Sequence, residues 1–204
     1  MLSLKNIVVG LTALAVPSLC QTSAQQAANY NDLSAKTAAL IPIANTISMI
    51  NGPLVIVDQG PFPPIIRGFS DIVNTGNTYV SQQQNAASVP AGAQSDAVVK
   101  AFSAFVKQQT SLVNILAQKA GLFTTAPFIG APIVQVLRQD EAVVDALVTQ
   151  TAGLVPSRSD EIRNLGSSLN SAIVTAQTAY EGAQTGGSVV RRSAEGRVAK
   201  MMVA

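Results

Sequence analysis

Histidine and tryptophan are absent from this 204-residue chain, and cysteine occurs once, as Cys20. Without histidine, the catalytic triads and dyads that use an imidazole base are excluded. Zinc sites built from histidine and cysteine are excluded for the same reason. A lone cysteine forms no disulfide within the chain. The chemistry open to this sequence is therefore narrow, and we expect neither a metal nor a cofactor.

Charge is also scarce. Charged residues make up 12% of the chain, against about 25% in an average soluble protein. The formal charge is +2, and no basic cluster lies in the body of the chain, so nucleic-acid binding is not expected. Because 48% of the residues are hydrophobic, the chain can bury enough apolar surface to fold. The length predicts one domain, or one domain with tails.

The first two dozen residues have the pattern of a secretory signal peptide. Lys5 supplies the positive start, 7–16 form a short apolar core, and Ser18 and Cys20 stand at the −3 and −1 positions of a cleavage site. Cleavage after Ala24 is the alternative. The apolar run is too short for a spanning helix, and no later segment is long enough either. We expect a secreted, extracellular protein whose mature form lacks Cys20.

Apolar residues after this leader recur with helical period. Pro42 should kink or split the first amphipathic segment, and the four prolines within 51–64 argue against helix there. Only 54–57 reads as β-like. The sequence therefore predicts an all-α fold, an antiparallel bundle of about five amphipathic helices within a domain spanning 27–183. The expected helices lie at about 27–50, 65–85, 96–121, 132–155 and 159–183.

The last segment differs in kind. Four basic residues between 184 and 204 are opposed only by Glu195, so we expect a flexible, basic C-terminal tail. Arg191 and Arg192 also form a dibasic pair of the kind that proteases process. Cleavage at this pair and an intact tail both remain open.

An acidic cluster on the fourth expected helix is the one candidate for catalysis or metal binding. Asp140, Glu141 and Asp145 lie close together in the sequence, and Glu141 and Asp145 share a helix face. Acidic residues on a helix are usually a solvated surface, and nothing else in the chain completes a site. We expect no enzyme and no metal site here.

The inner faces of the third and fourth expected helices could line an acyl chain. A polar residue, Gln109, interrupts the first of these seams, and Asp140 shares a face with apolar residues of the second. Gln109 could anchor a ligand carboxylate, which an ionised Asp140 would repel. Alternatively, the two residues lie at helix edges or bond each other. The candidate lining residues are Phe102, Phe105, Leu112, Leu116, Leu137 and Val144.

Two connecting segments are more apolar than loops usually are. Val55 and Ile56 belong to the first, and Phe123 and Phe128 to the second. Exposed apolar patches commonly mark a partner, ligand or membrane contact. These segments could instead fold back and close the end of the bundle, and a closing loop could also serve as a ligand lid.

Three stretches together carry a family resemblance. The first, residues 105–123, reads FVKQQTSLVNILAQKAGLF. The second, residues 134–147, reads VQVLRQDEAVVDAL, and the third is Leu154-Val-Pro156. With the leader, this resembles the fungal hydrophobic surface-binding protein A family, also called cell wall galactomannoproteins. The likeness extends from about Ala27 to Tyr180.

The resemblance implies a secreted, non-catalytic helical protein. Members adsorb to hydrophobic surfaces and can recruit polyester-degrading hydrolases, and related domains enclose fatty acids between helices. The resemblance therefore implies a lipid or hydrophobic surface as partner, with a secreted hydrolase as a further one. This chain lacks the Ser/Thr-rich stalk and anchor signal of wall-anchored members, so release into the medium is favoured over cell-wall association. An adaptor or structural wall protein is the alternative function.

Overall fold

Five long α-helices account for most of the computed structural model, which describes residues 21–123 and 127–201 and, beyond Gly182, the backbone alone. The described part of the chain contains no strand, and the all-α prediction is confirmed. Short 3-10 turns, η1 to η4, lie between the helices at Gly52–Val57, Gly121–Phe123, Pro127–Ile129 and Pro156–Arg158. The helices are α1 Ser23–Asn45, α2 Phe62–Gln83, α3 Ala93–Ala120, α4 Gly130–Leu154 and α5 Ser159–Met201.

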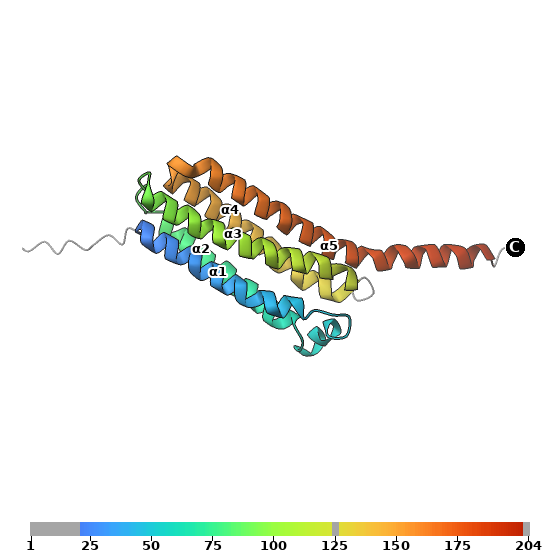
Figure 1. The fold of residues 1–204 in the computed structure, drawn as a ribbon. Coiled ribbons are helices and arrows are strands. Elements are labelled where there is room, and N and C mark those ends of the chain that lie inside the picture. The colour runs from blue at the N-terminus through green and yellow to red at the C-terminus, as the bar shows by residue number, and fades with distance from the viewer. Residues whose placement is uncertain (1–20, 124–126, 202–204) are drawn as a thin grey trace, which may run out of the picture.

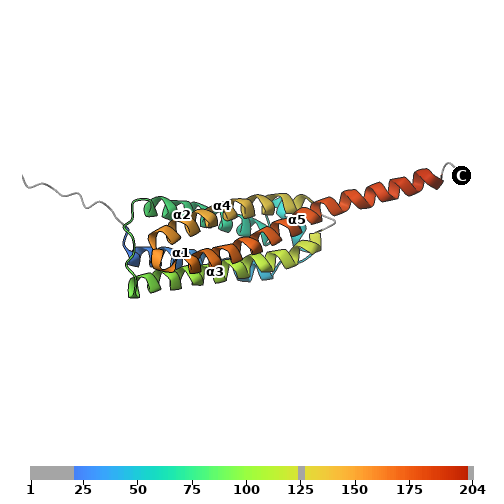
Figure 2. The same ribbon diagram turned by 90° about the horizontal axis from the view of Figure 1, so that it is seen from above.

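The helices form a closed ring in which chain neighbours are antiparallel (Figures 1 and 2). Around the ring, α1 packs on α3, α3 on α5, α5 on α4, α4 on α2, and α2 on α1. The connection 46–61 lies at one end of the bundle together with 121–123 and 127–129, and we call this end the tip. The connections 84–92 and 155–158 lie at the opposite end, which we call the base (Figure 1).

The prolines break fewer helices than the sequence predicts. Helix α1 runs through Pro42 without splitting. The segment expected to lack helix contains η1, and α2 already begins at Phe62. Pro63 and Pro64 occupy the first turn of α2, where a backbone N–H has no partner within the helix. The β-like run from Leu54 to Val57 is therefore helical, which corrects that expectation.

The helix ends follow capping groups that the sequence shows only in part. Helix α1 starts earlier than expected because Thr22 and Gln25 form a capping box, in which Thr22 Oγ1 accepts from the Gln25 backbone N–H. Helix α3 also starts earlier than expected, because Gly92 has a φ of 111° and Ser95 Oγ binds its backbone at 2.8 and 3.1 Å. Pro156 ends α4 close to the expected position.

Helix α5 continues as backbone helix to Met201 and extends past the tip (Figures 1 and 2). The expected flexibility of 184–204 and processing at Arg191-Arg192 stay predictions. The expected signal peptide, residues 1–20, lies outside the described residues. Among the described residues, no helix combines the length and apolarity needed to cross a membrane.

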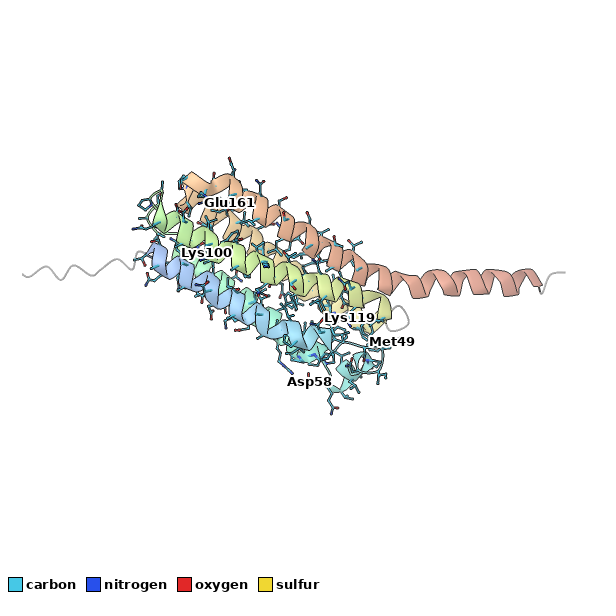
Figure 3. The ribbon with its side chains drawn as sticks, in the orientation of Figure 1. Met49, Asp58, Lys100, Lys119 and Glu161 are labelled. Carbon is cyan, nitrogen blue, oxygen red and sulfur yellow. The ribbon has the colours of Figure 1, made fainter. Side chains whose placement is uncertain are left out.

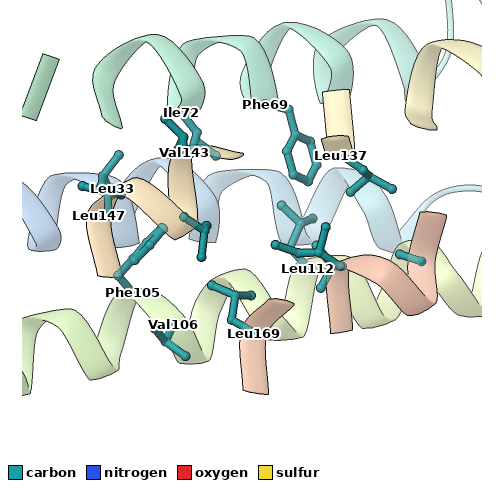
Figure 4. Close-up of a cluster of buried hydrophobic side chains, with 14 of the residues drawn as sticks. Leu33, Phe69, Ile72, Phe105, Val106, Leu112, Leu137, Val143, Leu147 and Leu169 are labelled. Carbon is teal, nitrogen blue, oxygen red and sulfur yellow. The ribbon is translucent and has the colours of Figure 1, made fainter. Parts of the chain in front are cut away.

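One apolar core joins all five helices. Aromatic side chains belong to this core, and Tyr30 packs edge-on against Phe102 with ring centroids 5.1 Å apart. Leu33 and Leu40 lie seven residues apart on the inner face of α1, as the sequence predicts. Figure 4 shows how Phe105, Leu112, Leu137 and their neighbours meet along the bundle axis.

Candidate functional site

The predicted lining residues lie together in the interior of the bundle. Four of them belong to α3 and two belong to α4, and all six side chains are fully buried. Four shallow hollows on the described surface include none of them. Their side chains pack against one another, so a ligand would have to part these helices. The six residues are Phe102, Phe105, Leu112, Leu116, Leu137 and Val144.

Gln109 lies in the middle of the bundle and is already hydrogen-bonded at both ends of its amide. Thr37 Oγ1 donates to Gln109 Oε1 at 2.7 Å, and Gln109 Nε2 donates to Asp140 Oδ2 at 2.7 Å. The three fully buried residues thus tie α1, α3 and α4 together. This confirms the alternative that Gln109 and Asp140 bond each other. Its role as a ligand anchor would require breaking one of these bonds.

Burial raises the pKa of Asp140 from 3.8 to about 7, and the hydrogen bond from Gln109 opposes this shift. The other carboxyl oxygen, Oδ1, is buried and has no hydrogen-bond partner among the described residues. Desolvation disfavours the charged form of a carboxyl group, which explains the direction. Near neutral pH this carboxyl group is therefore partly protonated.

The acidic cluster of α4 does not form a site. While Asp140 points into the core, Glu141 accepts a hydrogen bond from Gln177 Nε2 at 2.7 Å, and Asp145 pairs with Asn170 of α5. The three carboxyl groups therefore have separate partners. Among the described residues, no group of three or more potential metal ligands gathers.

A second buried polar cluster, which the sequence analysis missed, lies near the base. Gln83 Nε2 of α2 donates to Tyr30 Oη of α1 at 2.9 Å, and Tyr30 Oη also pairs with Thr151 Oγ1 of α4. Gln26, one turn before Tyr30, is fully buried as well. We call Gln26, Tyr30, Gln83 and Thr151 the base cluster. The signal was present, because positions 26, 30, 33, 37 and 40 follow one face of a helix.

The base cluster has unused hydrogen-bonding capacity. Gln26 Nε2, Gln26 Oε1 and Gln83 Oε1 are buried and have no partner among the described residues. Buried polar groups are normally hydrogen-bonded, and each exception requires an explanation. Thr151 Oγ1 is satisfied differently, since it donates to Leu147 O at 2.6 Å.

Within the described part of the chain, the tip carries most of the large apolar side chains that face solvent. Ile56 is 71% exposed and Phe128 47% exposed, while Val55 is half-buried. The sequence analysis did not single out the neighbouring Met49 and Ile50, and Ile50 is 89% exposed. Figure 3 shows Met49 at this end of the molecule. The stretches 37–57 and 120–137 contain no charged residue.

Phe123 corrects one expectation about the tip. It was predicted as a surface contact, but it is only 2% exposed. Its ring packs edge-on against Phe62 with centroids 5.2 Å apart, and it lies directly over Gly52. Each of the two interpretations of the apolar loops therefore holds for part of them. Phe123 folds back and closes the end of the bundle, whereas Ile56 and Phe128 remain exposed.

Comparison with solved structures identifies two proteins of similar fold. Afmp4p, solved in complex with palmitic acid, superposes with a TM-score of 0.68 over 78% of this chain and 99% of that chain, at 13% identity. Ligand binding domain 2 of Penicillium marneffei MP1 protein, complexed with multiple arachidonic acids, gives 0.63 over 76% and 93%, at 17% identity. No protein-family model matches the chain, and no curated protein matches it.

Proposed function

We propose that this protein is a non-catalytic binding protein that holds a long acyl chain between its helices. The observation that carries the proposal is the single apolar core, to which all five helices contribute. Two bundles of the same fold were solved with fatty acids, which supports extending lipid binding to this chain. The same proposal has two further parts. The protein is distantly related to the hydrophobic surface-binding family, and it is secreted.

The binding energy would come from burial of apolar surface. An acyl chain inserted beside Phe105, Leu112 and Val144 would exchange water for side-chain contacts, at about 25 cal/mol per Å². The helices would have to separate, because these residues are fully buried in the structure. Apart from its length, the structure of the acyl chain would have little effect on affinity, since the proposed lining offers few directional contacts.

A cavity-forming substitution tests whether the ligand enters the core. Leu112→Ala should lower the free energy of unfolding of the ligand-free protein by about 2–5 kcal/mol. Palmitic acid should then restore more stability to this variant than it adds to the original protein, because the chain fills the new space. The measurement is the thermal unfolding midpoint with and without palmitic acid.

Val174→Ala is the matched control, because Val174 lies on the outer face of α5 and is exposed. It should leave both stability and the response to palmitic acid unchanged. An equal palmitic acid response in Leu112→Ala and the original protein would place the ligand outside the core. Absence of any response in all three proteins would contradict lipid binding.

Adsorption to hydrophobic surfaces is the second candidate function, and the exposed tip favours it. Among the side chains that the structure describes, seven large hydrophobic ones are exposed; six of them lie at this end, and Val174 is the exception. Apart from Asp58, the connections at the tip carry no charge, so this end can approach a waxy or polymeric phase with little desolvation cost. The same surface could recruit a secreted hydrolase, in which case the protein would act as an adaptor in the medium or at the cell wall.

A further inference from the structure

The base cluster combines full burial with unused hydrogen-bonding groups. Gln26 is fully buried and Gln83 is 1% exposed. Three of their four amide atoms lack a partner among the described residues, while the fourth, Gln83 Nε2, donates to Tyr30 Oη. An unpaired buried polar group costs about 1–3 kcal/mol. This cluster therefore destabilises the ligand-free fold unless another group supplies the partners.

Three helices bring Tyr30, Gln83 and Thr151 together, and Gln26 lies one turn before Tyr30 on the same face of α1. Side chains of a helix lean toward its N-terminus, so the ring of Tyr30 leans over the turn that contains Gln26. Gln83 approaches Tyr30 Oη from α2 and Thr151 approaches it from α4. The rings of Phe102 and Phe105, at 5.1 and 6.5 Å from that of Tyr30, mark where the polar cluster meets the apolar core.

The cluster has no formal charge. Its members are two amides, a threonine and a tyrosine whose pKa burial raises. On the surface of the base, the cation Arg158 is already paired with Asp96 and Glu161. A buried anion would therefore meet no positive side chain within the cluster, and burying an unpaired charge is costly.

We infer that the base cluster binds the head of the acyl ligand, and that this head is a neutral group that both donates and accepts hydrogen bonds, such as a hydroxyl or a protonated carboxylic acid. The unpaired atoms comprise one donor nitrogen and two acceptor oxygens, which match such a head. This inference rests on the proposed function, and it gives the ligand a direction: head at the base, chain along Phe102 and Phe105 toward the tip.

The Gln109 network is a weaker candidate for the same task. Both ends of the Gln109 amide are already bonded within the protein. One unpaired atom remains there, Oδ1 of Asp140, whereas the base cluster has three. Neither amide atom of Gln26 has a hydrogen-bond partner among the described residues, so Gln26 is the better position to substitute in a test.

The test compares the purified protein with Gln26→Met, which keeps side-chain length and removes the amide. The probes are 1-hexadecanol, hexadecane and hexadecylsulfonate, which share a chain and differ in the head. Gln26→Met should weaken hexadecanol binding about tenfold and leave hexadecane binding unchanged. The ligand-free variant should unfold at the same temperature or higher, because it loses an unpaired polar group rather than a bond.

Gln109→Met is the control, because its amide is fully engaged. It should lower the unfolding temperature and weaken binding of the three probes to a similar degree. Equal hexadecanol and hexadecane losses in Gln26→Met, or a lower unfolding temperature of that variant, would show that the cluster is structural or holds resident water, which overturns the inference. Tighter, Gln26-dependent binding of hexadecylsulfonate would overturn the neutral head. Failure of every probe to bind the original protein would instead refute the proposed function.

Discussion

Buried polar side chains in this bundle differ in whether their atoms are paired within the protein. Thr37 and Gln109 are paired and connect α1 to α3, so their main effect is to fix the register of the helices. Asp140 is paired at one oxygen only, and Gln26 at neither amide atom. Unpaired atoms such as those of the Gln26 amide are the ones that would gain a partner from the proposed ligand.

Asp140 should make the stability of the protein depend on pH. Its pKa is raised to about 7 in the folded state, against 3.8 without the fold. The folded protein therefore holds this proton more tightly than the unfolded chain does. Its contribution to stability is complete below about pH 4 and is lost as the pH rises through 7, by about 4 kcal/mol in all. Urea unfolding between pH 4 and pH 8 measures this change.

Asp140→Asn should remove that dependence, because an amide keeps the shape and does not ionise. The variant should be more stable than the original protein at pH 8. Asp145→Asn is the control on the same helix, since Asp145 is exposed and should leave the pH profile as it was. An unchanged profile in Asp140→Asn would show that another group titrates.

Helix α3 shows what the sequence predicts well at the scale of the element. Its apolar seam, with Phe102, Phe105 and Leu112, continues over many turns, and the structure buries all three. The apolar periodicity places the starts of α1 and α2 too late. A Thr–Gln capping box fixes the first start and prolines in the first turn fix the second, and such local signals involve too few residues to show in a periodic pattern. Periodicity also cannot show that Gln83 reaches Tyr30, because that contact joins residues 53 positions apart.

The turn η1 depends on a glycine. A Cβ added to Gly52 would lie 2.0 Å from Cε1 of Phe123 and 2.7 Å from Cζ. Gly52→Ala should therefore displace the Phe123 ring from Phe62 and cost about 1–3 kcal/mol. Hydrogen exchange should speed up within 46–61 and 121–123 and stay unchanged at the base.

Gly121→Ala and Gly153→Ala are matched controls, because nothing lies within 4 Å of the added carbon at either position. Both glycines are in or beside a helix, where alanine is tolerated or stabilising. Slower exchange or unaltered stability in Gly52→Ala would contradict the packing of the tip.

At the scale of the whole molecule, the bundle has two unlike ends. The base has a buried, uncharged polar cluster, and the tip presents exposed apolar side chains on connections whose one charged residue is Asp58. Helix α5 extends beyond the tip (Figure 1). This difference between the ends would allow the proposed lipid binding and the proposed surface contact to occupy separate regions of one molecule.

Substituting the exposed tip residues should separate the two functions. The variant with Ile50→Ser, Ile56→Ser and Phe128→Ser should adsorb several-fold less to an alkane-coated quartz microbalance, because the exposed apolar area falls. Its stability and palmitic acid binding should stay close to those of the original protein, since these side chains lie outside the core.

Val174→Ser is the control for loss of apolar area elsewhere on the surface, and it should adsorb as the original protein does. Equal adsorption of the triple variant would rule out the tip as the contact surface. Loss of palmitic acid binding in the same variant would show that the tip also forms part of the lipid site.

Native mass spectrometry tests the central claim, lipid binding between the helices, most directly. The purified protein is measured under native and denaturing conditions, before and after addition of palmitic acid. We expect extra mass in the native spectrum that disappears on denaturation and extracts into organic solvent, or one that appears after palmitic acid is added. A native mass equal to that of the bare chain, unchanged by added palmitic acid, would contradict the claim and leave surface adsorption as the better account.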